Sequence, residues 1–420
     1  MLLCYVLRIM KTEAMDLHKK LRGKLFIGEK TPLTFEGLPL LYTPGVAEPC
    51  LEISRDPNTA YDLTWKWNSV AVISDGSRVL GLGNIGPLAS MPLLEGKAQI
   101  FSHFGKVDAV PLAVESLSVE ETVKIVKSVQ YGFGGINLED ISIPRCYSIL
   151  DRLIEELDIP VWHDDQQGTA TIIVSGLLNA LEVTGRKLSN ANIILLGSGA
   201  ANTSVYLLLK HVGVDPKQFK VFNSKGILGT HRPELADVPR IKMICDETNP
   251  SGKNISLEDA FKNADAVIAL SKSGYGGIKP EWIKTMSKSP IVFACANPIP
   301  EIDPKLAKEA GAAVVATGRS DYPNQVNNAL VFPGMFRGAL DVRAKGISWG
   351  MAFEVAKEIA LMAKEKGLKP DYIVPRIDEP NLHFRVAKAA ALTAIKEGMA
   401  RTELNENEIT ALIEKNINRA

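Results

Sequence analysis

The chain has 420 residues, and its 48 Lys and Arg residues balance its 48 Asp and Glu residues, so its formal net charge is zero. Without an excess of either sign it has no field to hold a nucleic acid or an anionic membrane, and we expect neither as a partner. The length is enough for two domains, each with its own core. The five cysteines lie far apart, without a Cys-x-x-Cys pair, which argues against a zinc site and favours a reducing cytoplasm.

Residues 1–10 are apolar but lack a basic start and a small-residue cleavage site. Ten residues are also too few to cross a bilayer core of roughly 30 Å. We therefore predict no targeting signal in this stretch. A start codon upstream of the functional one, with the functional chain beginning near Met10, would also explain it.

Short β-rich runs alternate with helical patterns in the first part of the chain, which predicts a parallel α/β sheet. The expected strands are 70–74, 109–113, 135–138 and 160–162, and the expected helices are 119–131 and 144–157. A long apolar helix should follow at 169–184.

A second β/α series comes after that helix and is the better candidate for a dinucleotide-binding sheet of the Rossmann type. Its expected strands are 192–196, 220–222, 265–270, 291–294 and 313–316. From residue 338 the pattern is almost entirely helical, and we expect this tail to pack back onto one or both domains.

Two glycine motifs compete for the cofactor pyrophosphate. Residues 81–86 form a complete G-x-G-x-x-G, but Pro87 and Pro92 disfavour a helix running directly out of that turn. We interpret it as a tight loop beside the substrate. The second motif has Asn202 in place of the third glycine, yet it follows an apolar strand and leads into a helical pattern. We assign the pyrophosphate to its residues Gly197, Ser198, Gly199, Ala200 and Ala201.

In such folds, residues at the end of the next strand contact the cofactor ribose. Here it carries Asn223 and Lys225 and no carboxylate that would repel a 2′-phosphate. This favours NADP over NAD, and the alternative is that Lys225 is simply a solvated turn residue.

Two acidic pairs stand at the ends of neighbouring predicted strands: Glu139-Asp140 and Asp164-Asp165. In a parallel sheet both pairs leave at the carboxyl edge, where open α/β folds bind their ligands. The pairs would repel one another unless a cation compensates, and carboxylates suit Mg²⁺ or Mn²⁺. A divalent metal site is therefore predicted, with a surface charge cluster as the alternative.

Two further residues could carry proton transfer. Lys97 begins an apolar helical run, and a lysine near a metal can have its pKa lowered from about 10.4 towards neutrality, which would make it a general base. Tyr42 heads a turn-forming stretch that would hold a phenol at a loop tip. Taken alone, a solvated lysine and a packing tyrosine are the commoner roles.

These residues lie within blocks that resemble the malic enzyme family, in the short form found in bacteria and archaea. The resemblance extends from about Leu21 to Arg343. Its blocks are Tyr42-Thr-Pro-Gly-Val-Ala-Glu-Pro49, Ser74-Asp-Gly-Ser-Arg78, Glu95-Gly-Lys-Ala98, Gly135-Ile-Asn-Leu-Glu-Asp140, His163-Asp-Asp-Gln166, Ala296-Asn-Pro298, and residues 320–328 followed by Phe332-Pro-Gly334.

The resemblance implies oxidative decarboxylation of L-malate to pyruvate by a homodimer that uses NAD or NADP with Mg²⁺ or Mn²⁺. It also implies residue roles: Glu139, Asp140 and Asp165 as metal ligands, Lys97 as general base, Tyr42 as general acid, Asp164 as support for the metal shell or the lysine, and Arg78, Asn297 and Asn328 as malate-binding residues. Gln167 departs from the family's usual histidine, while Asn202 and Asn223 replace a common glycine and a frequent Asp, which leaves the choice of cofactor open.

The fold expected on this basis is an N-terminal α/β malic-enzyme domain over residues 1–165, a Rossmann-type domain over 166–345 and a helical segment over 346–420. Three alternatives stay open. A malolactic enzyme shares much of the pattern. A metal-independent hydroxy- or amino-acid dehydrogenase leaves the acidic residues without a role, and a catalytically silent nucleotide sensor leaves Tyr42 and Lys97 without one.

Overall fold

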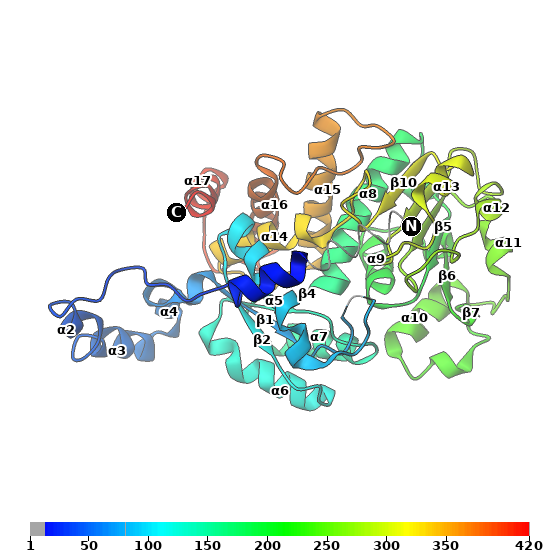
Figure 1. Cartoon of the computed structure of the whole chain (residues 1–420). Coiled ribbons are helices and arrows are strands. Elements are labelled where there is room, and N and C mark those ends of the chain that lie inside the picture. The colour runs from blue at the N-terminus through cyan, green and yellow to red at the C-terminus, as the bar shows by residue number, and fades with distance from the viewer. Residues whose placement is uncertain (1–12, 80, 420) are drawn as a thin grey trace.

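The computed structural model describes residues 13–79 and 81–419, so the predictions about residues 1–10 lie outside it. Two sheets form the body (Figure 1). The first is wholly parallel in the order β2-β1-β3-β4. Its strands and helices are β1 (Ser69–Ser74), α5 (Gly86–Gly105), β2 (Asp108–Ala113), α6 (Val119–Val129), β3 (Gly135–Leu138), α7 (Arg145–Glu156) and β4 (Val161–His163).

The second sheet has the order β10-β9-β8-β5-β6-β7, parallel except for the β6–β7 pair. Helix α8 (Thr169–Val183) leads into it from the first sheet. Its elements are β5 (Ile193–Leu196), α9 (Ala200–His211), β6 (Phe219–Asn223), β7 (Gly226–Ile227), α10 (Pro239–Thr248), α11 (Leu257–Phe261), β8 (Ala266–Ala269), α12 (Pro280–Ile283), β9 (Ile291–Ala294), α13 (Pro304–Glu309) and β10 (Val314–Thr317). The predicted fold class is confirmed, and of this sheet only β7 was missed.

Four C-terminal helices cover the junction of the two sheets: α14 (Phe332–Asp341), α15 (Trp349–Glu365), α16 (Leu382–Lys396) and α17 (Glu406–Ile417). Helix α14 packs on α5, and α15 packs on α8 and α9, so the tail contacts both sheets as expected. One apolar core includes Val72 of β1, Ile173 of α8, Leu195 of β5 and Phe336 of α14. The two sheets are therefore joined through shared side-chain packing.

The prediction about the Gly81–Gly86 turn was wrong in one respect, because α5 begins at Gly86 itself. Pro87 lies in the first helical turn, where its missing N–H has no intrahelical partner to lose. Pro92 is accommodated farther along the same helix. Among the described residues, no helix has the length and apolar character needed to span a membrane.

The N-terminal arm, residues 13–64, includes α2 (Leu38–Leu41), α3 (Ala47–Arg55) and α4 (Ala60–Leu63). Figure 1 shows α2 and α3 at the far left of the molecule, away from both sheets. Several of the arm's large apolar side chains are almost fully exposed, Phe26 at 92% and Ile27 at 96% among them.

Candidate active site

The carboxyl edge of the first sheet carries a buried cluster of charges. Strands β3 and β4 are hydrogen-bonded neighbours with Leu138 opposite His163, so Glu139 and Asp164 leave the sheet side by side. Lys97 reaches both of them from α5: its Nζ lies 2.5 Å from Asp164 Oδ2 and 3.0 Å from Glu139 Oε1. The structure thus brings together three residues that are 42 and 25 positions apart in the chain.

Lys97 lies on the buried face of α5, beside Leu94, Ala98 and Phe101. Its side chain is almost inaccessible, and its Nζ also lies 4.4 Å from the centre of the Phe332 ring. A buried ammonium is stable only with partners of opposite charge. Asp164 and Glu139 supply them.

These contacts decide the protonation of the lysine. Burial by itself lowers the pKa of Lys97, but the neighbouring Asp164 and Glu139 carboxylates outweigh burial and raise it. The expectation of a lysine pKa lowered towards neutrality was made for a lysine beside a bound metal, and it stays a prediction. The prediction counted a cation beside the lysine and did not anticipate two carboxylates within 3.0 Å of it.

The carboxylates in turn repel one another. Burial raises the pKa of Glu139 well above its usual value, Lys97 opposes that rise, and Asp165, Asp164 and Asp140 add to it. Burial likewise raises the pKa of Asp164 against the effect of Lys97. Lys97 pairs directly with two of these four acidic groups, Glu139 and Asp164.

Asp140 and Asp165 border the cluster. The Asp140 backbone N–H donates to Asp165 Oδ2 at 2.8 Å, and the Asp140 carbonyl accepts from the Arg78 backbone N–H at 3.0 Å. Asp165 is partly exposed, and the His163 Nδ1 lies 3.8 Å from its Oδ2. Burial lowers the pKa of His163 to about 4, so that ring is neutral near pH 7.

A divalent cation fits this site by donor chemistry. Within residues 13–79 and 81–419, no three Asp, Glu, His or Cys side chains converge closely enough to hold a metal ion. The Glu139 carboxylate is turned onto Lys97 instead. Even so, carboxylate oxygens leave from adjacent strand ends, and oxygen donors of this kind are the ligands that Mg²⁺ and Mn²⁺ favour.

Asp164 is held by more than the lysine. It opens a single π-helical turn, Asp164–Gly168, and its Oδ1 accepts from Trp162 Nε1 at 3.2 Å. A Cβ on Gly168 would lie 1.9 Å from Asp164 Oδ1, so only glycine leaves room for this carboxylate. Such π-turns are frequent at functional sites. Sequence reasoning missed the role of Trp162.

The predicted malate-binding residues surround the cluster. Asn328 begins a short 3₁₀ turn that packs against the π-helical turn. The side chain of Asn297 lies against Gly318, and its carbonyl faces Gly81, so the glycine turn after β1 packs beside it. Arg78 is exposed, with its backbone tied to Asp140.

Two supporting ion networks were missed by sequence reasoning. Arg145 of α7 donates to the Asp75 carboxylate and to the Leu117 carbonyl, which holds the loop that carries Arg78. Glu301 is fully buried and accepts from the backbone N–H groups of Ser271 at 2.7 Å and Ala296 at 3.1 Å. In the sequence, the one feature that pointed to the Arg145 network was the position of Asp75 directly after a predicted strand.

Tyr42 is the one predicted catalytic residue that lies outside the cluster. It ends α2 on the arm, and 65% of its surface is exposed. Figure 1 places α2 far from α5 and β4.

The turn that we expect to bind the dinucleotide lies between β5 and α9 of the second sheet. Gly197 has a φ of 102°, and a Cβ there would lie 2.5 Å from the Leu270 carbonyl, whereas the space in front of Gly199 is open. Gly199 precedes Ala200 and Ala201 at the start of α9, where no side chain caps the free N–H groups. Asn202 holds the turn by donating to the carbonyls of Leu196 and Gly197. These features suit a pyrophosphate.

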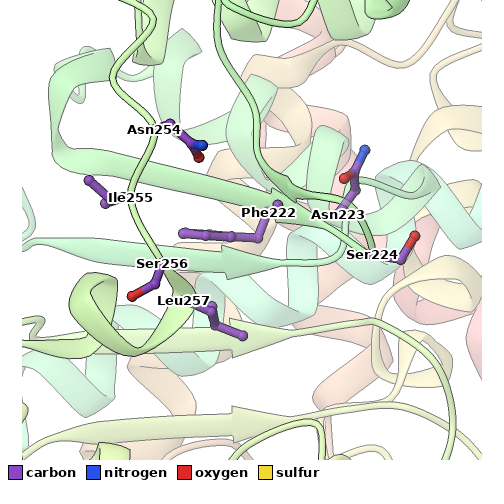
Figure 2. A pocket seen from close by; sticks show the side chains of 8 residues that line it. Phe222, Asn223, Ser224, Asn254, Ile255, Ser256 and Leu257 are labelled. Atoms are coloured by element: carbon purple, nitrogen blue, oxygen red, sulfur yellow. The ribbon is translucent and has the colours of Figure 1, made fainter.

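A cavity of about 490 Å³ lies beside the end of β6 (Figure 2). It is lined by Phe222, Asn223, Ser224, Gly226, Asn254, Ile255, Ser256 and Leu257. Lys225 is exposed at its border, and its backbone N–H donates to Asn223 Oδ1 at 2.9 Å.

A dinucleotide turn on one sheet and a buried lysine–carboxylate cluster on the other define the class as a nicotinamide-dependent oxidoreductase. Two family models agree: "Malic enzyme, N-terminal domain" matches residues 25–117, and "Malic enzyme, NAD binding domain" matches residues 166–395. The chain belongs to the malic enzyme family, as the sequence motifs predicted.

Relatives cover almost the whole chain. The "bifunctional malic/malolactic enzyme" of Bacillus subtilis is 45% identical over 95% of this chain and 97% of its own length. The "NAD-dependent malic enzyme" of Geobacillus stearothermophilus is 47% identical over 91% of this chain and 78% of its own. The crystal structure of Entamoeba histolytica malic enzyme, 42% identical, superposes with a TM-score of 0.93 over 97% of this chain and 86% of that one.

The close approach of Gly168 to Asp164 is testable. We expect Gly168→Ala to displace the Asp164 carboxylate and to lower turnover by about tenfold or more, because small displacements of catalytic groups are costly. Gly132→Ala is the matched control, since a Cβ at Gly132 meets no atom within 4 Å. Equal turnover of the two variants at equal thermal stability would contradict the assigned role of this glycine.

Proposed function

We propose that this chain oxidises L-malate with NAD⁺ or NADP⁺ and decarboxylates the product to pyruvate and CO₂ with the help of Mg²⁺ or Mn²⁺, and that it also decarboxylates oxaloacetate. The observation that carries the proposal is the buried contact of Lys97 with both Glu139 and Asp164 at the sheet edge. A surface charge cluster would not be buried in this way. Membership of the malic enzyme family supports the same reaction.

Glu139, Asp140 and Asp165 would hold the divalent cation. When bound, the cation supplies Lewis-acid polarisation of the malate C2 oxygen and stabilises negative charge that develops there. Asp164 serves as a positioning residue, because its two oxygens already accept from Lys97 and Trp162.

Lys97 acts as the general base that takes the proton from the C2 hydroxyl while hydride leaves C2 for the nicotinamide. This role requires the amine to lose its own proton first. A cation bound to the neighbouring carboxylates would offset their negative charge, which now raises the pKa of Lys97. After CO₂ leaves, Tyr42 donates a proton to C3 of the enolate, which yields pyruvate.

The remaining predicted residues bind the ligands. Arg78, Asn297 and Asn328 hold the malate carboxylates and hydroxyl, and the turn formed by Gly197, Ser198, Gly199, Ala200 and Ala201 binds the pyrophosphate. Asn223 and Lys225 contact the ribose. The corresponding division is a substrate and metal domain over residues 1–165, a cofactor domain over 166–345 and a helical segment over 346–420.

The position of Tyr42 supports a homodimer. The arm exposes large apolar side chains, with Phe35 at 86% and Leu40 at 77% exposed, and surfaces of this kind mark protein contacts. We assign the arm to a second copy of the chain, whose active site then receives Tyr42. The three buried free thiols Cys146, Cys245 and Cys295 suit the cytoplasm as the compartment.

Initial rates with L-malate, Mn²⁺ and each nicotinamide cofactor test the reaction. We expect reduced cofactor, pyruvate and CO₂ to accumulate in equal amounts, and chelation of the metal to stop all three, because the cation stabilises the developing charge. The Bacillus subtilis relative's name keeps the malolactic reaction as a second candidate. Lactate without free reduced cofactor would favour that candidate, and turnover resistant to chelators would refute metal dependence.

Removal of one metal ligand should directly weaken the binding of the metal. We expect Asp165→Ala to raise the Kd for Mn²⁺ at least about tenfold, the loss seen even for outer-shell partners of metal ligands, as measured by calorimetry without substrate. Asp246→Ala is the control, because Asp246 pairs only with Lys242 on an exposed helix face. Wild-type affinity in the Asp165 variant would remove this residue from the ligand set.

Mixed dimers test where Tyr42 acts. Lys97→Ala and Tyr42→Phe should each lower turnover by about a hundredfold or more. If each site combines Lys97 of one subunit with Tyr42 of the other, a random mixture of the two variants should regain about a quarter of wild-type activity, since one site of every heterodimer is intact.

The control mixture pairs Lys97→Ala with Asp164→Asn, which leaves every heterodimer site damaged and should stay inactive. If the Lys97→Ala and Tyr42→Phe mixture also stays inactive although heterodimers are isolated, Tyr42 does not act across the dimer.

A further inference from the structure

Arg240 crosses from the second sheet to the first. It lies in the first turn of α10, yet its partners lie on α7 and in the turn after β4. Its Nη1 donates to Gln166 Oε1 at 2.5 Å, its Nη2 donates to Asp151 Oδ1 at 2.8 Å, and its guanidinium stacks on the Tyr147 ring at 4.4 Å. Three contacts of different kinds thus hold one side chain that is only 8% exposed.

Gln166 carries this contact into the candidate site. It is the middle residue of the π-helical turn Asp164–Gly168 and is fully buried. Its Oε1 accepts from Arg240, and its Nε2 donates to the Cys146 carbonyl of α7 at 3.2 Å. Both ends of the amide are therefore occupied, and Gln166 ties α10 to the turn and to α7 at once.

Asp165, directly before Gln166, depends on the backbone of this turn for its position. Its side chain is 37% exposed, and its Oδ2 accepts from the Asp140 backbone N–H. A π-helical turn is a rare backbone form, so it needs support from its surroundings. The buried contact between Arg240 and Gln166 supplies such support next to Asp165.

The three contacts of Arg240 differ in weight. The pair with Asp151 is largely open to solvent, because the Asp151 side chain is 62% exposed, and exposed pairs contribute little. The bond to Gln166 is buried and charge-assisted, which makes it the stronger one. Apolar contacts also join α10 to the first sheet, since Val238 and Ala200 pack on the apolar core around Tyr147. Loss of Arg240 should therefore disturb the turn and leave the two sheets together.

We propose that Arg240 is a positioning residue for the Asp164–Gly168 turn: it acts through Gln166 and so sets the direction of the Asp165 carboxylate. The planar guanidinium suits this role, because it donates in two directions while it stacks on an aromatic ring. The effect on metal binding rests on the proposed function, in which Asp165 is a metal ligand. The effect on the turn itself does not.

Calorimetry with Mn²⁺ alone tests the effect on the metal without turnover. We expect Arg240→Gln to raise the Kd for Mn²⁺ about tenfold or more, a loss typical of outer-shell residues that orient metal ligands. Asp151→Asn is the matched control, because it removes the exposed partner of Arg240 and keeps the bond to Gln166. Its Kd should stay within about twofold of wild type. A folded Arg240→Gln protein with the wild-type Kd overturns the proposal.

A double-mutant cycle tests whether Arg240 acts through Gln166. Gln166→Met removes the acceptor at similar volume and should raise the Kd for Mn²⁺ to a similar extent. Adding Arg240→Gln to Gln166→Met should then change the Kd by less than about twofold, because residues of one network are not additive. Two effects that multiply in the double variant would show that Arg240 acts independently of Gln166, against the proposal.

Amide hydrogen exchange of the metal-free protein separates this inference from the proposed function. In Arg240→Gln we expect faster exchange in a peptide covering residues 162–170 and unchanged exchange in β5, because local opening is confined to the segment that loses its contacts. Asp151→Asn should match wild type in both segments. Unchanged exchange in the turn, or faster exchange in both segments, overturns the inference. If the wild-type chain binds no Mn²⁺, the proposed metal site fails, and the exchange rates still decide whether Arg240 orders the turn.

Discussion

The burial of Lys97 among carboxylates is the constraint on which the rest of the site depends. A lysine this deep in the chain needs negative partners, and carboxylates this deep need positive ones. Asp164 and Glu139 meet the lysine from two adjacent strands. Asp140 and Asp165 border these three residues. The protonation of Lys97 then depends on whether another cation also binds its carboxylate partners.

The two sheets are tied together beside this cluster. Arg240 of α10 stacks on Tyr147 of α7 at 4.4 Å, and it also donates to Gln166 in the π-helical turn at 2.5 Å and to Asp151 at 2.8 Å. The Tyr147 hydroxyl reaches the Ser198 carbonyl of the dinucleotide turn at 3.5 Å. Contacts of this kind hold the pyrophosphate turn and the acidic strand ends in a common frame, as hydride transfer between two bound ligands requires.

The arm shows the opposite behaviour. Its helices are short, and α3 packs mainly on neighbouring parts of the arm. The chain buries Lys97 and Asp164 in its interior, and it leaves the Tyr42 phenol on an arm with exposed apolar side chains. Exposed apolar area of this kind is stabilised by burial against another surface.

Much of the fold followed from the sequence, since hydrophobic periodicity is local information. The strand ends with Glu139 and Asp164, the turn at Gly197 that leads into a helix, and the family itself could all be predicted from residue order. The helix starting at Gly86 was not, because a proline in a first turn is allowed and the local rule was applied too strictly. Burial and pairing belong to the tertiary structure. Only packing placed two carboxylates within 3.0 Å of Lys97 and so raised its pKa, and only packing left Tyr42 exposed on the arm. Each of these depends on which distant residues share a low-dielectric space, and residue order alone does not contain that distance.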